Sequence, residues 1–457
     1  MAGMGLWTSC TAWPVQPIVV IASCERRRTL TDETELAMIF HSTSPADDTP
    51  PSELLVPTVT ARCEPALPTF GVEEEFALVD PATGHVATVA PEVISACADA
   101  HGVVAEVMRY MVETRTPVSR SVEGLCQALL ARRIAVATEA ARRGAVVVAC
   151  GVAPLGQPQP PPLTEEVRYR ELAARFPGPI STAGTLGCHV HVAVPTRAAG
   201  VGVLRRTRCW IPALIALTAN SPIYLGHDTN WAGWRYRLAT RWPTACPPLP
   251  VESVAAYDDM VTTAIATGDA LDARNVYFLI RLSPRYPTVE VRLADVLPTA
   301  EEAAAYAGIV RALVVQAMRD AEAGRPIPDI DQARLVSVCD AAARGGLTGA
   351  VLDVATDQIV RGWELVDALL RYVLPSLARD PEATTVLSTL ELIRLTGGGA
   401  DRQRQLWQRE HSPAAFAREL AHWTTAPGLQ WAPPMSNQGQ QIGVPAETGT
   451  SRPVAPR

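Results

Sequence analysis

Three consecutive carboxylates stand in an otherwise apolar segment of this sequence. The segment TFGVEEEFALVD, residues 69–80, contains Glu73, Glu74 and Glu75. A carboxylate buried without a partner is costly, and it tends to take up a proton. Carboxylates gathered on a rigid surface with an imidazole can instead bind Mg²⁺ or Mn²⁺, which favour oxygen ligands. These three glutamates are therefore the first candidates for a chemical role.

Alternation along β-strands decides which polar side chains can meet, because successive side chains point to opposite faces. In GVEEEFAL, Glu73 and Glu75 share one face, and Glu74 lies on the other among apolar neighbours. The segments MVETR, CHVHV and TVEVR also carry polar residues on a shared face. Those residues are Glu113 and Arg115, His189 and His191, and Glu290 and Arg292.

Four segments with this pattern predict a metal site, provided that their strands join one sheet. The structural alternative is a solvated sheet face, on which scattered Glu and Arg are ordinary. Four carboxylates brought together without a cation would repel one another. We therefore predict that Glu73 and Glu75 bind metal. Glu74 should point to the opposite side, where burial would require a partner such as Arg.

A second set of candidates is rich in arginine. The stretch NWAGWRYRLATRWPTACPP, residues 230–248, either stacks Arg on Trp or supplies guanidinium groups for phosphate or carboxylate. LTGGGADRQRQ, residues 395–405, either connects two helices or presents backbone N–H groups and Arg402 to phosphate. All 40 basic residues are arginine, and the absence of lysine excludes a Walker P-loop.

The elements expected to position these residues do not alternate strictly between strand and helix. Residues 121–143 have a helical period that stops at Gly144. Thr299 with Glu302 forms a capping-box pattern, and Ser412 before Pro413 is typical of a helix start. This arrangement favours the α+β class with an antiparallel sheet.

Composition narrows the class of protein. The 457 residues are 48% hydrophobic and 19% charged, and the net charge of −7 does not favour nucleic acid or anionic membrane as a partner. The ten cysteines are scattered without a C-x-x-C pair, so reduced thiols and a cytoplasmic location are expected. No apolar run reaches the ~18 residues of a membrane span.

Several motifs taken together resemble the glutamate–cysteine ligase type 2 family, and most closely its carboxylate–amine ligase branch. They occur in the family's order between about 68 and 425, and they are FGVEEEFALVDPATG, GCHVHVAVP, ALTANSPIYLGHDT, WRYRLATRWPT, RLSPRYPTVEVRLADV and GGGADRQRQ. The resemblance implies a glutamine-synthetase-like fold, with a curved antiparallel sheet, its active site on the concave face and helices packed on the outer face. It also implies that ATP and Mg²⁺, with Mn²⁺ as an alternative, are used to join a carboxylate to an amine through an acyl phosphate.

The resemblance also assigns residue roles. The implied metal ligands are Glu73, Glu75, Glu113, His189 and Glu290. Arg235 and Arg292 match arginines expected near phosphate or substrate, and we take both as catalytic and, with Arg402, as nucleotide-binding.

The resemblance divides the chain into three parts. Residues 1–67 are expected to be a flexible extension, 68–427 the catalytic domain and 428–457 a disordered tail. Small carboxylates and amines, with amino acids foremost, are the expected partners, and a homodimer is one possible assembly.

Departures from the family pattern affect the substrate pocket. Cys246 stands at a glycine of the family, Leu279 where an acidic residue is often found, and Ala193 at another glycine. Glutamate and cysteine are therefore not fixed as the substrates. Two alternatives to the ligase stay open. They are a non-catalytic relative that binds nucleotide and metal, and a metal-dependent phosphohydrolase.

Overall fold

The computed structural model describes residues 66–97, 102–410 and 412–426. The described elements run from Phe70 to Thr425, within the stretch predicted as the catalytic domain. Apart from residues 66 and 67, the predicted extension 1–67 lies outside the described residues, as does the predicted tail 428–457. Within the described ranges, no helix combines the length and apolar character needed to cross a bilayer.

One antiparallel sheet organises the fold. Its strands follow the order β2–β3–β1–β5–β9–β8, and β4 pairs with the end of β1. The strands are β1 (Phe70–Val79), β2 (Val103–Ala105), β3 (Met111–Arg115), β4 (Val146–Val148), β5 (Gly187–Ala193), β8 (Ile280–Leu282) and β9 (Thr288–Asp295). The four segments predicted to carry polar faces, now β1, β3, β5 and β9, are therefore neighbours.

The strand register brings the predicted polar faces together. Glu73 on β1 lies opposite Arg115 on β3 and His189 on β5. Glu75 pairs with Glu113 across β1 and β3, and across β5 and β9 His191 pairs with Glu290. Paired residues in neighbouring strands point to the same face. The polar side chains therefore converge on one side of the sheet.

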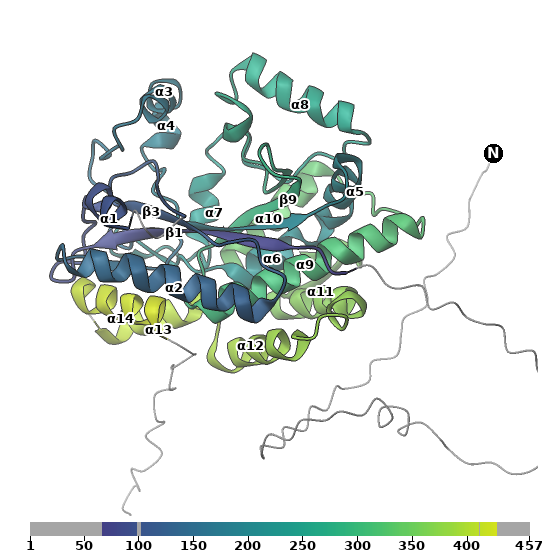
Figure 1. Cartoon of the computed structure of the whole chain (residues 1–457). Helices are drawn as coiled ribbons and strands as arrows, with labels where there is room; N and C mark the ends of the chain where they lie inside the picture. Colours follow the sequence, from purple (N-terminus) through teal and green to yellow (C-terminus); the bar gives the residue numbers. More distant parts are fainter. Residues whose placement is uncertain (1–65, 98–101, 411, 427–457) are drawn as a thin grey trace, which may run out of the picture. The chain divides into compact units, whose positions relative to one another are not determined.

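Helices cover the opposite face of the sheet (Figure 1). The helices α2 and α9 contact β1, α9 also contacts β5, and α14 contacts β4. The apolar strand residues Val72, Val190 and Val291 are buried on this side together with the long helix α9. The helices of this layer are α2 (Val122–Ala141), α9 (Ala300–Glu322), α11 (Gly362–Leu377), α12 (Ala383–Thr396), α13 (Gly399–Glu410) and α14 (Pro413–Thr425).

The helix starts occur where the sequence predicts them. Ser121 caps α2 by accepting from the Gly124 N–H at 3.1 Å. Thr299 caps α9 by accepting from the Glu302 N–H at 3.2 Å, and Ser412 caps α14 in the same way. These caps fix where the covering helices begin relative to the sheet.

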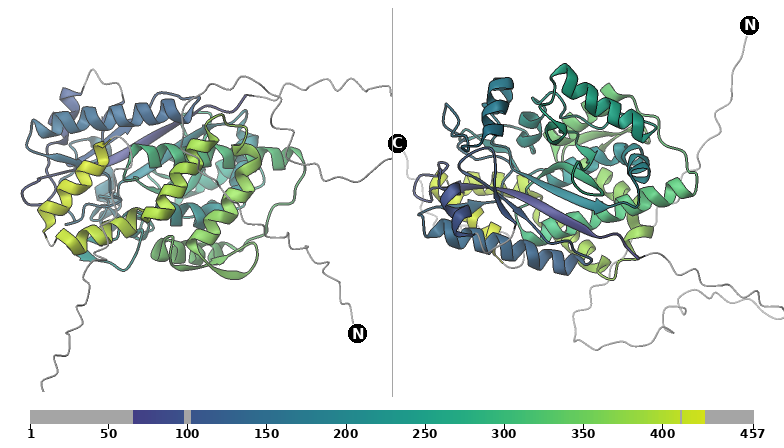
Figure 2. Two further views of the ribbon diagram at one scale, coloured as in Figure 1. Left: turned by 90° about the horizontal axis from the view of Figure 1, so that it is seen from below. Right: turned by 45° about the horizontal axis from the view of Figure 1, so that its top comes forward.

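Shorter elements lie on the polar side of the sheet, among them α3 and α8 (Figures 1 and 2). The remaining elements are α1 (Ala90–Ala96), α3 (Val167–Arg175), α4 (Pro177–Ile180), α5 (Arg197–Thr207), α6 (Ile211–Thr218), α7 (Trp234–Ala239), α8 (Val254–Thr267), α10 (Gln332–Gly345), β6 (Ile223–Tyr224), β7 (His227–Asp228), β10 (Ala350–Asp353), β11 (Gln358–Arg361) and the 3₁₀ turns η2 (Arg208–Trp210) and η3 (Ala273–Asn275).

Candidate active site

A cavity of about 470 Å³ lies over the polar face of the sheet. Strand residues line its floor, and residues of α3, α7 and the segments before β8 line its walls. Seven of the eight site residues expected from the sequence line this cavity, and they are Glu73, Glu75, Glu113, His189, Arg235, Glu290 and Arg292. The structure thus brings together residues that are up to about 220 positions apart in the chain.

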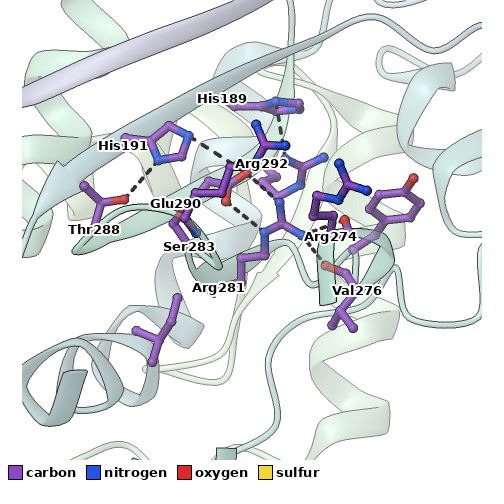
Figure 3. Close-up of polar contacts among 12 residues, drawn as sticks. His189, His191, Arg274, Val276, Arg281, Ser283, Thr288, Glu290 and Arg292 are labelled. Carbon is purple, nitrogen blue, oxygen red and sulfur yellow. Dashed lines mark hydrogen bonds and ion pairs between the residues drawn. The ribbon is translucent and has the colours of Figure 1, made fainter. Parts of the chain in front are cut away.

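A first group of possible metal ligands combines Glu73, His191 and Glu290. One ligand atom from each lies within 4.8 Å of the others. The Nε2 atom of His191 is 3.9 Å from a Glu73 oxygen and 4.0 Å from a Glu290 oxygen. This nitrogen is buried and has no hydrogen-bond partner, while Nδ1 lies 3.0 Å from the Thr288 hydroxyl (Figure 3). The free nitrogen of His191 therefore points to the two carboxylates.

The predicted ligand His189 lies between two groups of carboxylates. Its Nδ1 atom is 3.7 Å from Glu73, and its Nε2 atom is 3.9 Å from Glu75. Nδ1 also lies 3.4 Å from the Arg292 guanidinium (Figure 3). Burial and the charge of Arg292 lower the pKa of His189, which favours the neutral ring. The structure thus keeps His189 at the site and adds His191.

A second acidic group contains Glu75, Glu106 and Glu113, again with ligand atoms within 4.8 Å of one another. Burial, together with the nearby Glu75 carboxylate, raises the pKa of Glu106 to about 7. Burial and the charges of Glu106 and Glu73 raise the pKa of Glu113 well above its usual value. Carboxylates that ionise with such difficulty are suited to a divalent cation, which removes the repulsion. This donor set fits Mg²⁺ or Mn²⁺.

Sequence reasoning missed Glu106. It lies just after β2, in an irregular stretch where alternation makes no prediction. Glu106 is the only polar residue of the segment AEV, residues 105–107, so no alternation with other polar residues marks it as a site residue.

Arginines surround Glu290 on β9. Arg281 of β8, directly opposite in register, binds its two oxygens at 2.8 and 3.0 Å, and Arg292 forms an ion pair with one of them (Figure 3). Burial alone would raise the pKa of Glu290, but Arg292 and Arg281 lower it overall. Glu290 is therefore an anion even at this buried position. Arg281 was not singled out from the sequence, although it lies on the same strand face.

Arg235 is available to an anion. Its guanidinium donates to the carbonyls of Leu293 and Arg292 at 3.2 and 3.3 Å, and its Nε atom is buried without a partner. Among the described residues, no ion pair joins Arg235 to a carboxylate within 4.0 Å. Only 7% of the residue is exposed, so its charge is held at the cavity wall. Arg292, in contrast, already pairs with Glu290 and lies over the Tyr277 ring.

Arg402 is the expected site residue that the structure places elsewhere. It is buried in α13, where one guanidinium nitrogen lies 2.7 Å from both oxygens of Glu302 on α9. It also lies over the Trp423 ring, and it does not line the cavity. The prediction that Arg402 contacts phosphate is therefore corrected. The Arg402 guanidinium instead joins α13 to α9 through Glu302, on the side of the sheet that the helices cover.

Glu74 points away from the cavity, as alternation predicts. It is fully buried, and Arg133 of α2 binds both of its oxygens, with one of these hydrogen bonds at 3.0 Å. Arg133 also donates to the carbonyls of Leu297, Pro298 and Thr424. The expectation that a buried Glu74 needs an arginine partner is confirmed.

A family model and several known proteins match this chain. The model of the glutamate–cysteine ligase family 2 (GCS2) matches residues 69–422. The chain is 39% identical over 341 residues to a Saccharopolyspora erythraea protein named "Putative glutamate--cysteine ligase 2-1", covering 75% of this chain and 90% of that protein. A Mycolicibacterium smegmatis protein named "Putative glutamate--cysteine ligase 2-3" is 40% identical over 362 residues, with 79% and 99% covered.

Two solved structures share the fold. The glutamate–cysteine ligase of Francisella tularensis in complex with AMP has a TM-score of 0.61 and 12% identity, covering 78% of this chain and 89% of that one. A bifunctional glutathione synthetase of Pasteurella multocida has a TM-score of 0.57 and 14% identity, with 78% and 52% covered. These likenesses confirm the predicted fold class. With a family model matching most of its length, the chain belongs to the glutamate–cysteine ligase family 2.

Proposed function

We propose that the chain is an ATP-dependent ligase that joins a small carboxylate to an amine through an acyl phosphate. The observation that carries the proposal is the convergence of two acidic groups and the unpaired cation of Arg235 on one cavity. Family membership supports ligase chemistry of the glutamate–cysteine ligase type. The AMP in the Francisella tularensis structure supports a nucleotide as one ligand.

The two acidic groups are the proposed metal sites. Glu73, His191 and Glu290 form one, Glu75, Glu106 and Glu113 form the other, and His189 lies between them. Mg²⁺ held by these residues would supply positive charge that neutralises phosphate oxygens. All of these residues except Glu106 lie on strands, which hold side chains more rigidly than loops would and favour a defined arrangement.

Part of the cavity lining is suited to the nucleotide base. It consists of apolar and aromatic side chains from one buried cluster, including Leu172, Ala183, Trp242 and Ala245. A lining that combines apolar side chains with carboxylates and arginines matches the two halves of ATP. We therefore assign the base to the apolar residues and the phosphates to the metal sites and arginines.

The proposed reaction has two steps. A carboxylate oxygen of the first substrate attacks the γ-phosphorus, and ADP leaves. The amine nitrogen then attacks the acyl carbon, phosphate leaves, and the nitrogen loses a proton to solvent. Arg235 donates hydrogen bonds to the phosphoryl oxygens, and Arg292, held by Glu290, adds positive charge beside them.

The substrates of this chain need not be glutamate and cysteine. Leu279 lines the cavity and gives its wall an apolar surface at a position where the family often has a carboxylate. Cys246 is half-buried nearby, where it packs with Ala270, Val276 and Phe278. A small amino acid with an apolar side chain fits such a wall better than a charged one, so amino acids beyond glutamate and cysteine belong in the test.

A screen of amino acid pairs tests the proposal. Each pair is incubated with the protein, ATP and Mg²⁺, and condensation is detected by mass spectrometry while ADP release is followed. We expect ADP release that depends on both a carboxylate and an amine. Phosphate release without condensation would favour a phosphohydrolase. No turnover with any pair, in a protein that still binds nucleotide, would favour the non-catalytic alternative.

A further inference from the structure

A buried turn behind the cavity has polar contacts that the proposed chemistry does not use. Asn220 and Ser221 follow α6 and are 1% and 0% exposed. Asp295, at the end of β9, accepts the Asn220 backbone N–H at 2.8 Å and the Ser221 hydroxyl at 2.6 Å, both through the same oxygen. Buried polar groups need partners, and these three satisfy one another.

The Ser221 hydroxyl connects this turn to Arg235. The backbone N–H of Arg235 donates to Ser221 Oγ at 2.9 Å. The Ser221 hydroxyl donates its single proton to Asp295, which leaves the serine oxygen to accept from the Arg235 N–H. Asp295 therefore sets the direction of the hydroxyl. The hydroxyl in turn fixes the backbone from which the guanidinium extends.

The glycine-rich segment that begins α13 supports the turn from behind. Gln403 donates to the Asn220 backbone and side-chain oxygens at 2.8 and 2.6 Å. A Cβ atom on Gly399 would lie 2.4 Å from the Asn220 side-chain oxygen, so only glycine permits this approach. The segment considered from the sequence as a phosphate loop thus contacts Asn220 instead.

Arg235 is held at both ends. Its backbone is fixed by Ser221, and its guanidinium by the carbonyls of Arg292 and Leu293 on β9. Asp295 is the last residue of the same strand. Arg235 lines the cavity, and among the described residues no carboxylate pairs with its guanidinium within 4.0 Å. A small rotation of α7 would therefore move a cation that is available to phosphate.

We propose that Ser221, oriented by Asp295, is a positioning residue that aims Arg235 at the terminal phosphate of ATP. This inference rests on the proposed function for the identity of the ligand. It makes the Asn220–Ser221 turn, Asp295 and Gln403 parts of one support for a single guanidinium.

The test compares nucleotides that differ by that phosphate. Dissociation constants for the Mg²⁺ complexes of ADP and of the non-hydrolysable analogue AMPPNP are measured by calorimetry for wild type, Ser221→Ala, Arg235→Ala and the double variant. We expect Ser221→Ala to weaken AMPPNP binding about 10-fold, the size of one lost hydrogen bond to a charged site, with ADP changed less than about 2-fold. In the Arg235→Ala background, Ser221→Ala should have no further effect.

A matched control separates positioning from general loss of stability. Ser376 is also buried, and its hydroxyl donates to Gln316 at 2.8 Å between α11 and α9, away from the cavity. Ser376→Ala should lower the melting temperature about as much as Ser221→Ala while leaving both dissociation constants unchanged. Equal weakening of ADP and AMPPNP by Ser221→Ala would overturn the inference, as would additive effects in the double variant.

A second variant keeps the test decisive if Ser221→Ala does not fold. Asp295→Asn keeps an oxygen that can accept both hydrogen bonds but removes the charge that orients the hydroxyl. We expect an AMPPNP-specific loss of about 3-fold, absent in the Arg235→Ala background. An unchanged AMPPNP constant, or a loss shared with ADP, would contradict the inference. A wild type that binds both nucleotides but condenses no amino acid pair would contradict the proposed function alone.

Discussion

Neighbouring glutamates on the two faces of β1 meet opposite surroundings. Glu74 is fully buried on the helix side, where Arg133 binds both of its oxygens. Glu73 and Glu75 face the cavity, where other carboxylates and two histidines are their neighbours. The charge of Glu74 is balanced by the protein itself, whereas on the cavity side the carboxylates of Glu75, Glu106 and Glu113 lie close to one another.

This difference shows that residue type alone does not tell whether a glutamate stabilises the fold or takes part in the reaction. A buried ion pair with every polar atom bonded holds elements together, and loss of one partner leaves a bare charge. Glu106 and Glu113 do the reverse, because burial and neighbouring carboxylates raise their pKa values, so that their negative charge lowers the stability of the metal-free protein and favours a cation. Three adjacent positions in one strand thus serve both purposes.

The largest expected effect is on the helix side. Arg133→Met should lower the free energy of unfolding by roughly 3–5 kcal/mol, because Glu74 then stays buried without a partner. Urea denaturation measures the change. The control is Arg334→Met, which removes an ion pair with Asp357 that is 44% and 67% exposed and should cost less than about 1 kcal/mol. Similar losses of unfolding free energy in both variants would show that the buried Arg133–Glu74 pair stabilises the fold no more than an exposed pair does.

On the cavity side we expect the loss of activity to exceed any loss of stability. Glu73→Gln and Glu75→Gln should each reduce Mg²⁺-dependent ATP turnover by about 100-fold or more, close to 2.7 kcal/mol. In EDTA, the melting temperature of Glu75→Gln should stay equal to wild type or rise, because a charge that repels Glu106 and Glu113 is removed. Glu73→Gln should lower the melting temperature slightly, because burial alone would raise the pKa of Glu73 but His189 and His191 lower it overall. Glu74→Gln is the matched neighbour, and it should reduce stability more than metal dependence. Equal effects on metal dependence from all three variants would refute the division between the faces.

Metal addition sharpens the comparison without requiring turnover. At a Mg²⁺ concentration 30 times its dissociation constant, the wild type should gain about 2 kcal/mol in unfolding free energy. Glu74→Gln should keep this gain despite its lower starting stability, while Glu75→Gln should lose most of it. Thermal unfolding with Mg²⁺ and with EDTA measures this gain in stability. A gain retained by Glu75→Gln would remove that residue from the proposed metal site.

The smallest expected effect concerns the residue that the sequence did not reveal. Glu106→Gln should raise the stability of the metal-free protein by about 0.5–1 kcal/mol, since it relieves repulsion with Glu75 and Glu113 at a partly screened position. It should also reduce the stabilisation by Mg²⁺. Chemical denaturation in EDTA measures the first effect. A loss of stability would show that Glu106 supports the fold more than it repels its neighbours.

Period-two alternation explains why so much of the site could be predicted. It assigned Glu73 and Glu75 to one face and Glu74 to the other before the sheet was known, and the register confirms this assignment. The helix starts at Thr299 and Ser412 were equally accessible, because capping depends on residues close together in the sequence. Strand alternation and helix capping are local patterns that can be recognised in a single sequence.

Contacts between distant segments could not be predicted in the same way. Arg402 and Glu302 are separated by 100 positions, and nothing in GGGADRQRQ shows that the guanidinium turns to another helix. The choice between His189 and His191 depends on the β-bulge between β5 and β9 and on which ring nitrogen is already bonded. These outcomes depend on tertiary packing, which the motif does not contain.

Arg133 donates to acceptors that are far apart in the sequence, and this affects the order of folding during synthesis. Its acceptors lie on β1, on the segment before α9 and at Thr424 near the end of α14. During synthesis, Arg133 on α2 leaves the ribosome long before Thr424. Until Thr424 follows, one of the acceptors of the Arg133 guanidinium is missing. We expect β1 to become fully fixed only after α14 has been synthesised, as domains of this size fold through partly packed intermediates. Pulsed hydrogen exchange on stalled chains ending before α14 should show β1 amides protected less than in the full protein.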